Sequence, residues 1–445
     1  MLKKKIFNMK IKKQFSERLF YLKLFNKLFP IPRSITGKGY RKSLNILKKY
    51  IPFKIKKFNS GTKVFDWIVP LEWDVQEAKL INSKNKVICD YDKNNISLMS
   101  YSKSVSKIYK FKDIKNNLYT IKKEENLTPY TTSYYKNNWG FNLPYRIYKT
   151  LKPNEKLKVN IKSTLKKGSL DIGLTTLKGK SKKIVLFSTY LCHPSMANNE
   201  LSGPLVMLGL YNHIKKIKNR KYNYMFLINP ETIGSLCFLK KYGNKLKKDI
   251  YAGLVLTCLG GNNNLNYKLS NNSESIFNKI FLHLKNYRKI KVRPFDPTSG
   301  SDERQFCSPG FNLPMGQISK SVYGTYKEYH TDGDNLKFMG IQNVIKSKNE
   351  ISEVIDLLEL NGKIYRSNPY GEPFLSKYNL YPNVNFNKNK NKNRKSYMLN
   401  LILKILSLSN GKYDLFDLSN IIGISIFEII DPIKELTNKK IIYLK

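Results

Sequence analysis

The chain has 445 residues, of which 80 are Lys or Arg and 32 are Asp or Glu, so its formal net charge is +48. Hydrophobic residues make up 41% of the chain and charged residues 25%, which is enough apolar material for a sizeable core and excludes a wholly disordered protein. Length and composition also exclude a collagen, a coiled-coil rod and a small disulfide scaffold, and they suit roughly two to four domains of ordinary size.

The strong positive charge raises the question of a nucleic-acid partner, because a basic surface is typical of phosphate binding. Here the lysines are scattered along the whole chain beside many Asn and Ile, as in Lys390–Lys395, and they form no single stripe. We therefore interpret the charge as a compositional bias that attracts anions in general. No specific nucleic-acid partner is expected.

The cysteines and the hydropathy pattern predict the compartment. Five cysteines, an odd number without CxxC spacing, argue against a disulfide framework and a Cys-rich zinc module. The basic segment Met1–Phe25 is interrupted by charges every few residues and has no signal-peptide core. No other segment approaches the roughly 20 apolar residues of a membrane helix. A soluble, cytoplasmic protein without a membrane span is expected.

The first third of the chain changes from a helical to a β-rich pattern. Apolar residues at helical spacing predict helices within Lys3–Tyr50, broken at Phe29–Pro32 and resumed near Lys38–Ile51. From about Gly61 to Ile161, short β-prone runs alternate with Asn, Asp and Pro turns and predict a separate β-rich unit; the runs are Lys63–Val69, Lys86–Tyr91 and Ser97–Ser102. This stretch holds all three tryptophans, for which core packing is the plainest interpretation.

The middle of the chain carries a βαβ pattern. Strands are predicted at Lys183–Tyr190, Tyr222–Asn229 and Tyr251–Cys258, with a helix at Leu205–Ile217 that Pro204 opens. Such alternation predicts an α/β fold, a mostly parallel sheet with helices on both faces. Functional loops then lie beyond the carboxyl ends of the strands.

The last section of the chain predicts a small winged-helix unit. The polar stretch Tyr381–Lys395 is typical of a linker. Three short helices and a β-like end follow it, at Ser396–Leu408, Leu415–Ile421, Ile426–Thr437 and Lys440–Leu444. The helix that would read DNA carries Glu428, Asp431 and Glu435, so a structural role or a protein partner is at least as well supported as DNA binding.

The chain has only four histidines, and two of them lie in polar loops. His193 directly follows a predicted strand, and His330 lies in a carboxylate-rich loop, whereas His213 and His283 lie in amphipathic helices and are interpreted as structural or exposed. With Glu231, just past another strand, His193 and His330 form a set that suits zinc, which binds neutral imidazole and carboxylate oxygen. A lone loop histidine is more often simply hydrogen-bonded at the surface, and the residues alone leave both interpretations open.

Six segments together resemble a family of uncharacterised bacterial proteins with an aminopeptidase-like domain, often labelled as polysaccharide-biosynthesis proteins. The resemblance covers about Leu28 to Lys445, and its segments are Phe29–Gly37 (FPIPRSITG), Trp67–Trp73 (WIVPLEW), Cys192–Pro204 (CHPSMANNELSGP), Pro230–Ser235 (PETIGS), Ser301–Phe306 (SDERQF) and Glu328–His330 (EYH). It implies a zinc-exopeptidase-like α/β core, an inserted β-rich lid domain and a C-terminal winged helix. The expected divisions are 1–60 (N-terminal helical part of the core), 61–161 (lid), 162–385 (core) and 395–445 (winged helix).

That core is similar to aminopeptidases that use two zinc ions. The similarity implies that His193 and His330 are metal ligands, that Glu231 is a ligand or the catalytic base, and that Asp302 supports the site as a further catalytic residue. The aspartates expected at two other positions are replaced by Asn199 and Thr257. A neutral amide cannot neutralise two divalent cations, so one zinc ion is expected. Nearby carboxylates, among them Glu200 and Glu328, could supply a missing ligand.

These observations predict a zinc-dependent hydrolase that acts on an amide or peptide bond, with a small peptide or an N-acyl or aminoacyl compound as substrate. The label of the family suggests a role in cell-surface polysaccharide biosynthesis. A non-catalytic binding or scaffold protein with a degenerate exopeptidase site is the alternative that Asn199 and Thr257 favour. A regulator that uses the winged helix, with the core as a sensor, is a third, and the winged helix could also bind a protein partner.

Overall fold

The computed structural model describes residues 2–381 and 392–445, and the side chains of residues 14–381 and 397–445. Two compact units divide the chain: unit 1 comprises Met1–Asn278 and Lys291–Ser352, and unit 2 comprises Lys279–Ile290 and Glu353–Lys445. Unit 1 contains every residue expected at the site.

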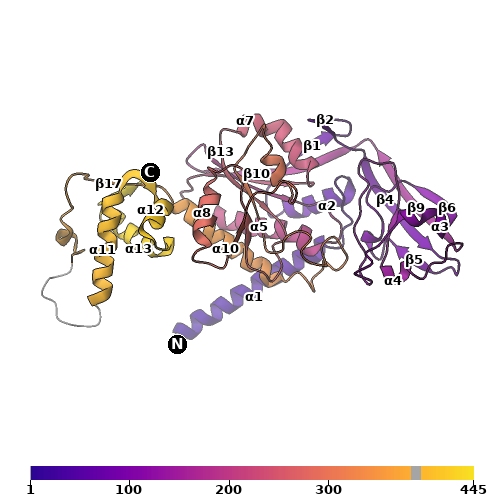
Figure 1. The fold of residues 1–445 in the computed structure, drawn as a ribbon, viewed down its shortest axis with the longest axis horizontal. Coiled ribbons are helices and arrows are strands. Elements are labelled where there is room, and N and C mark those ends of the chain that lie inside the picture. Colours follow the sequence, from indigo (N-terminus) through magenta and orange to yellow (C-terminus); the bar gives the residue numbers. More distant parts are fainter. Residues whose placement is uncertain (1, 382–391) are drawn as a thin grey trace. The chain divides into compact units, whose positions relative to one another are not determined.

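Unit 1 is built on an eight-stranded sheet (Figure 1) with the order β1-β10-β12-β11-β13-β16-β14-β15. The bounds are β1 (Lys54–Asn59), β10 (Ser169–Leu177), β11 (Ile184–Tyr190), β12 (Asn223–Asn229), β13 (Ile250–Leu256), β14 (Asn266–Lys268), β15 (Lys291–Arg293) and β16 (Met315–Ser319). Strands β12, β11, β13 and β16 are parallel neighbours, whereas β10 runs antiparallel to both of its neighbours, β1 and β12, and β14 runs antiparallel to β16. The predicted mostly parallel sheet is confirmed.

The central strands are apolar because both faces of the sheet are covered. All seven residues of β11 are buried, as expected for a parallel strand with helices on both sides. The helices of this region are α2 (Gly37–Lys48), α5 (Ser202–Lys215), α6 (Ile233–Phe238), α7 (Asn244–Leu246) and α9 (Glu303–Phe306). Two further helices, α8 (Ile276–Leu284) and α10 (Ile341–Leu360), each contribute residues to both units.

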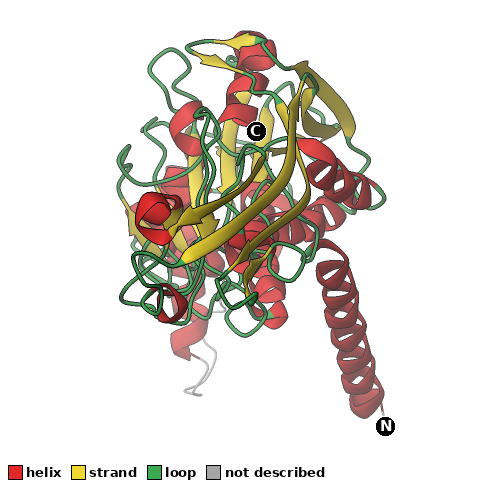
Figure 2. Ribbon diagram, turned by 90° about the vertical axis from the view of Figure 1, so that its right-hand side faces the viewer, coloured by secondary structure: helices red, strands yellow, loops and turns green. Residues whose placement is uncertain are grey.

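The N-terminal helices are where the sequence predicts them. Helix α1 spans Leu2–Leu28, ends before the Pro30 and Pro32 break, and is followed by α2. Figure 2 shows α1 as a long helix with the N-terminus at its far end. Its C-terminal portion is anchored by Tyr21, Leu24 and Leu28, each at most 2% exposed. This helix therefore leads directly into the Phe29–Gly37 segment that reaches the site.

The start of α5 differs from its prediction. The helix begins at Ser202 rather than at Leu205, so Pro204 lies within its first turn. A π-helical turn at Ala197–Leu201 precedes it and is completely enclosed by the protein. π-Helical turns are rare and occur mostly at functional sites. Here the turn carries Asn199 and Glu200.

A second, four-stranded sheet with the order β5-β4-β9-β6 lies in the β-rich part of the chain. The strands of this sheet are β4 (Glu72–Ile81), β5 (Val87–Asp90), β6 (Val105–Lys110) and β9 (Lys156–Lys166). The β-rich part also contains two short strand pairs, β2 (Lys63–Val64) with β3 (Trp67–Ile68) and β7 (Leu118–Tyr119) with β8 (Phe141–Asn142). Its two short helices are α3 (Phe111–Ile114) and α4 (Tyr145–Tyr148). The strand expected at Ser97–Ser102 is wrong, because that segment makes only isolated bridges. Trp73 and Trp139 are core residues as expected, whereas Trp67 is 40% exposed.

Unit 2 contains the winged helix. Its helices are α11 (Lys392–Leu408), α12 (Leu415–Ile422) and α13 (Ile426–Asn438), and its sheet β18-β17-β19 combines β17 (Lys363–Arg366), β18 (Asn410–Asp414) and β19 (Ile442–Leu444). His283 is structural as predicted: its Nε2 accepts a hydrogen bond from the backbone N–H of Ile426, at the start of α13. Most of the expected linker Tyr381–Lys395 lies outside the described residues.

All five cysteines are buried and unpaired. Among the described helices, none combines the length and the apolar character needed to cross a bilayer.

Candidate active site

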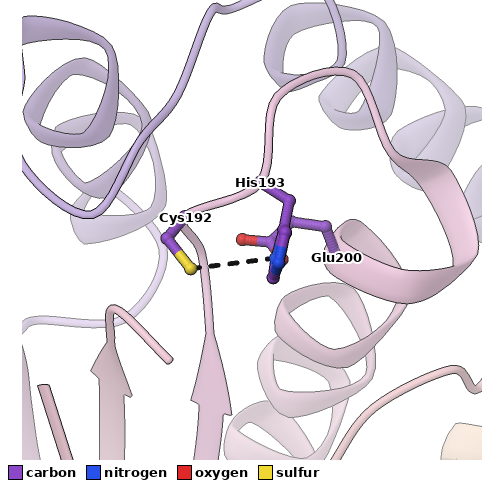
Figure 3. Close-up of side chains that lie close together, drawn as sticks. All are labelled: Cys192, His193 and Glu200. Atoms are coloured by element: carbon purple, nitrogen blue, oxygen red, sulfur yellow. Dashed lines mark hydrogen bonds and ion pairs between the residues drawn. The ribbon is translucent and has the colours of Figure 1, made fainter. Parts of the chain in front are cut away.

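The site lies beyond the carboxyl ends of β11 and β12. Cys192 and His193 follow β11, and Glu231 follows β12 by two residues. Figure 3 shows Glu200 approaching His193 from the helical turn that precedes α5. Because parallel strands end at the same edge of a sheet, residues far apart in sequence meet here.

His193 is held between two carboxylates. Its Nδ1 lies 2.6 Å from Glu200 Oε2, and its Nε2 lies 3.6 Å from Glu231 Oε2. The buried guanidinium of Arg33 also donates from Nε to the His193 carbonyl oxygen at 3.0 Å. Glu200 thus fixes a proton on Nδ1 and leaves Nε2 directed toward Glu231. A second carboxylate in this position is typical of histidines that bind metals.

The pKa values of the two histidines of the site are shifted in opposite directions. Burial acts to lower the pKa of His193, but the Cys192 sulfur and the Glu200 carboxylate outweigh it, and the pKa lies well above its ordinary value. Burial, with a smaller effect of His193, lowers the pKa of His330 to about 3. The ring centroids of the two histidines are 5.2 Å apart. His330 is therefore a neutral imidazole at neutral pH, the form that binds metals.

Glu231 is fixed at one carboxylate oxygen and open at the other. Its Oε1 accepts a hydrogen bond from Ser301 Oγ at 2.5 Å, and its backbone N–H points to Cys192 Sγ at 3.3 Å. Burial raises the pKa of its carboxyl group, although the side chain keeps 25% of its exposure. Oε2, the oxygen near His193, is therefore the one that can bind a metal ion or accept a proton.

Asp302 supports the turn that carries Glu231. Its carboxylate accepts hydrogen bonds from the backbone N–H of Thr232 at 2.6 Å, from Asn229 Nδ2 at 2.8 Å and from Ser235 Oγ at 3.1 Å. Burial, followed by the nearby charge of Glu231, raises its pKa to about 7. Thr232 has a φ of +62°, which is unusual for a β-branched residue and is typical of functional sites. The carboxylate that contacts a histidine of the site is that of Glu200, whereas Asp302 contacts the turn after β12.

Asn199 and Thr257 replace the two aspartates that the resemblance implies, and a neutral network connects them. The hydroxyl of Tyr190 lies 2.5 Å from Thr257 Oγ1 and 3.3 Å from Asn199 Nδ2. The backbone N–H of Asn199 donates to buried Asp334 at 2.8 Å, and burial raises the pKa of this carboxyl group to about 7. The network therefore places neutral hydrogen-bonding groups at the two positions where the resemblance implies carboxylates.

Glu328 lies apart from the other expected site residues. It lines a separate cavity of about 600 Å³ with Lys123, Lys327 and other polar residues. Its own loop does reach the site, since the backbone N–H of Tyr130 donates to the carbonyl oxygen of His330 at 2.7 Å.

A cavity of about 660 Å³ opens onto these groups. Its floor contains Cys192, His193, Glu231 and His330, and the seven consecutive residues Tyr130–Lys136 form much of its wall together with Trp67. Sequence reasoning missed the contributions of Arg33, Tyr130 and Ser301, since no local pattern distinguishes these residue types; only the Phe29–Gly37 and Ser301–Phe306 segments of the resemblance pointed to their surroundings.

The residues around His193 suit a cation. Ligand atoms of Cys192, His193 and Glu200 lie within 4.8 Å of one another. Burial raises the pKa of the Cys192 thiol to about 12, which disfavours the thiolate that a metal would need. Among the described side chains, Glu200 Oε1 and Asn199 Oδ1 are buried oxygens without a hydrogen-bond partner. Such orphaned acceptors are costly unless a cation or water pairs with them, so the donor set fits a metal ion.

Comparison with known proteins places the chain in a family. Residues 22–361 match the model of the family described as "Domain of unknown function (DUF4910)", and residues 363–443 match that of a winged helix-turn-helix. The chain belongs to the DUF4910 family. A Clostridium acetobutylicum relative, provisionally named a polysaccharide biosynthesis protein with aminopeptidase-like domain, is 39% identical over 400 residues, 89% of each chain.

Solved structures show the same fold. A crystal structure of a C. acetobutylicum protein, described provisionally as a peptidase, matches with a TM-score of 0.86 and 36% identity, covering 98% of this chain and 100% of that one. BSAP, a zinc aminopeptidase from Bacillus subtilis, matches with a TM-score of 0.55 at 12% identity, covering 75% of this chain and 94% of its own. The DUF4910 chain therefore has an aminopeptidase-like α/β fold followed by a winged helix.

Proposed function

We propose that this protein is a zinc-dependent hydrolase of an amide or peptide bond. The observation that carries the proposal is the position of His193, whose Nδ1 is engaged by Glu200 at 2.6 Å while its Nε2 faces Glu231 beside His330. The peptidase descriptions of the C. acetobutylicum relatives and the zinc aminopeptidase fold of BSAP support it.

We assign His193, Glu231 and His330 as the residues that would hold one zinc ion. When bound, zinc supplies a Lewis acid that lowers the pKa of a water molecule and polarises a carbonyl group. The chain's own residues then have distinct tasks. Glu200 keeps the proton of His193 on Nδ1, Ser301 fixes Glu231 Oε1, and Glu231 Oε2 is left to ligate or to accept a proton.

Asp302 is proposed to act through its neighbours. It contacts the turn Asn229–Ser235 and does not itself line the cavity, so it is a positioning residue for Glu231. The β-rich stretch 61–161 is proposed as a lid, because its residues Tyr130–Lys136 line the cavity. Division of the remaining chain into an N-terminal helical segment (residues 1–60), a core (residues 162–385) and a winged helix (residues 395–445) also stays a proposal.

The biological setting is likewise proposed. The name of the C. acetobutylicum relative suggests a role in cell-surface polysaccharide biosynthesis. Five buried, unpaired cysteines fit the reducing conditions of the cytoplasm. The acidic residues Glu428, Asp431 and Glu435 on α13 favour a protein partner for the winged helix.

Metal content is the first test. Elemental mass spectrometry of the purified full chain, supplied with zinc, should give about one zinc per chain, and His193→Ala and His330→Ala should each lose it. His213→Ala, in α5, is the matched control and should keep the zinc. A chain that binds no metal even with added zinc would contradict the proposal.

A second function is favoured by the neutral network of Asn199, Tyr190 and Thr257. Without the two aspartates, the fold could hold a ligand without cleaving it, as a binding or scaffold protein. Wild-type cellular function in a variant with both His193 and His330 changed to Ala would support this second function over the hydrolase.

A further inference from the structure

The part of the cavity wall formed by Tyr130–Lys136 and Trp67 has a distinctive chemistry. Residues Tyr130–Lys136 supply a continuous run of hydroxyl and aromatic side chains, ended by a lysine, and Trp67 lies beside them. Specificity in such cavities comes from a few polar groups placed among apolar and aromatic walls. These residues should therefore indicate the class of substrate.

Some of these polar groups are already paired within the protein. The Tyr130 and Tyr134 hydroxyls bond each other at 2.9 Å, Thr131 donates to Asn142 at 2.6 Å, and Ser133 donates to the Lys136 carbonyl oxygen at 3.0 Å.

Other groups of the lining remain available. Within the part of the chain that the structure describes, no hydrogen bond engages the side chains of Thr132, Tyr135, Lys136 or Thr232, which also line the cavity. Three hydroxyls and one ammonium are thus free to bind a ligand, and hydroxyls can both donate and accept.

The aromatic portion of the wall is open. Trp67 is 40% exposed and meets Tyr135, 52% exposed, edge to face with ring centroids 5.6 Å apart. The other tryptophans, Trp73 and Trp139, are 5% and 8% exposed. Each exposed ring offers a flat apolar face and carries a polar group at its edge, which matches a sugar ring, with its C–H faces and hydroxylated rim.

The charges of the lining disfavour a substrate with a free amine. Glu231 is the one carboxylate among the described residues that line the cavity, and it already contacts Ser301 and His193. The one lysine there, Lys136, would repel a second cation. An α-ammonium group, as at the N-terminus of a peptide, would find only Glu231 to replace its water, and the proposed reaction needs that carboxylate as a zinc ligand or base.

Resting on the hydrolase function proposed above, we propose that the site takes an N-acylated amino sugar. The acylated nitrogen carries no charge, the sugar ring lies against Trp67 and Tyr135, and its hydroxyls reach Thr132 and Thr232. In the reaction, the oxygen of water forms a bond to the acyl carbon and the C–N bond breaks. The acyl group leaves as a carboxylate, and the nitrogen of the sugar takes up both protons of the water molecule and leaves as an ammonium group.

Binding can be measured separately from turnover. Rapid-mixing tryptophan fluorescence of the zinc-supplied full chain should respond to N-acetylglucosamine through Trp67. Glucosamine, which differs by the acyl group alone, and leucinamide should bind at least about tenfold more weakly. Equal or tighter binding of either amine would overturn the proposal.

Two variants sharpen this test. Trp67→Ala should raise the Kd for N-acetylglucosamine about tenfold by calorimetry, whereas Ile108→Ala, an exposed lid residue outside the cavity lining, should not change it. Lys136→Glu should improve the binding of glucosamine relative to N-acetylglucosamine. An unchanged Kd in a folded Trp67→Ala chain, verified by circular dichroism, would also overturn the proposal.

Turnover assays distinguish failure of the amino-sugar proposal from failure of the hydrolase function. Faster cleavage of leucine p-nitroanilide than of N-acetylglucosamine would overturn the amino-sugar proposal and leave the hydrolase standing. Binding of N-acetylglucosamine without cleavage of any amide, with zinc bound, would overturn the hydrolase function and leave the ligand class standing.

Discussion

The ammonium group of Lys268 lies 2.9 Å from the carboxylate of Glu303, and both side chains are completely buried. Lys268 also donates to the carbonyl oxygens of Asp296 and Ser299. Glu303 in turn accepts the backbone N–H of Ser301 at 3.0 Å. The ion pair therefore shapes the loop that presents Ser301 to Glu231 and Asp302 to the neighbouring turn.

Loss of this ion pair should lower the stability of the folded protein. Lys268→Met leaves the Glu303 charge buried without its partner, so the free energy of unfolding should fall by about 3–5 kcal/mol. Urea unfolding measures the change. Lys149→Met, which removes a half-exposed ion pair with Glu125, is the control and should cost under about 1 kcal/mol. Equal effects of the two variants would contradict the structural role of Lys268.

The contact of Glu200 with His193 predicts a graded loss of metal affinity. Removing the carboxylate partner of a metal-binding histidine typically weakens the site by about 10–100-fold. Glu200→Leu should show this full loss in a zinc competition with a chelator. Glu200→Gln should lose less, because its amide oxygen can still accept the Nδ1 proton. Wild-type zinc affinity in Glu200→Leu would show that Glu200 does not orient the ligand.

Substitutions of Glu231 and of Ser301 should differ in their effects on activity and on zinc content. Glu231→Gln should lower kcat for an amide substrate by about 100-fold or more, since a base or ligand is lost. Zinc content should fall with it if Oε2 is a ligand and stay unchanged if Oε2 is the base. Ser301→Ala should keep its zinc and lose about tenfold in activity, as expected for a group that orients the carboxylate. Full activity in Glu231→Gln would remove Glu231 from the mechanism.

Restoring the two missing carboxylates should create a second metal position. In Asn199→Asp combined with Thr257→Asp, two anions replace the neutral network around Tyr190, and the zinc content should rise toward about two ions per chain. Elemental analysis at equal free zinc compares this variant with the wild-type chain. A value that stays near one in a folded double variant would show that more than these two charges separates this site from a two-metal centre.

The sequence predicts strands β11, β12 and β13 of the eight-stranded sheet because they are buried on both faces and appear as continuous apolar runs, whereas the other five strands of that sheet were not predicted. Strands β17 (KIYR) and β18 (NGKYD) escaped prediction because they are short and polar, and they exist through pairing with distant partners. At the site, His193 and Glu231 were found because they follow parallel strands. Ser301 was missed as a partner of Glu231 because their contact joins residues 70 positions apart, which no local pattern encodes.

The contact between α2 and β4, which connects the core to the β-rich stretch, should contribute less to stability at low pH. Arg41 of α2 makes two hydrogen bonds to Glu72 at the start of β4, at 2.8 and 2.5 Å. This guanidinium lowers the pKa of Glu72 below the ordinary 4.5. A lowered carboxyl pKa contributes stability that is present above the unfolded-state pKa and is lost as pH falls through the folded-state value.

The matched variant for this pair is Arg41→Met. Near pH 7 it should unfold more easily than the wild-type chain by about 1–3 kcal/mol, because Glu72 is left nearly buried without its charged partner. The difference should shrink as the pH falls below 4.5, where the unfolded carboxyl group is protonated and the folded one follows at lower pH. Urea unfolding at several pH values measures this difference in the free energy of unfolding. A difference that is constant with pH would mean that Arg41 stabilises the contact between α2 and β4 by packing alone.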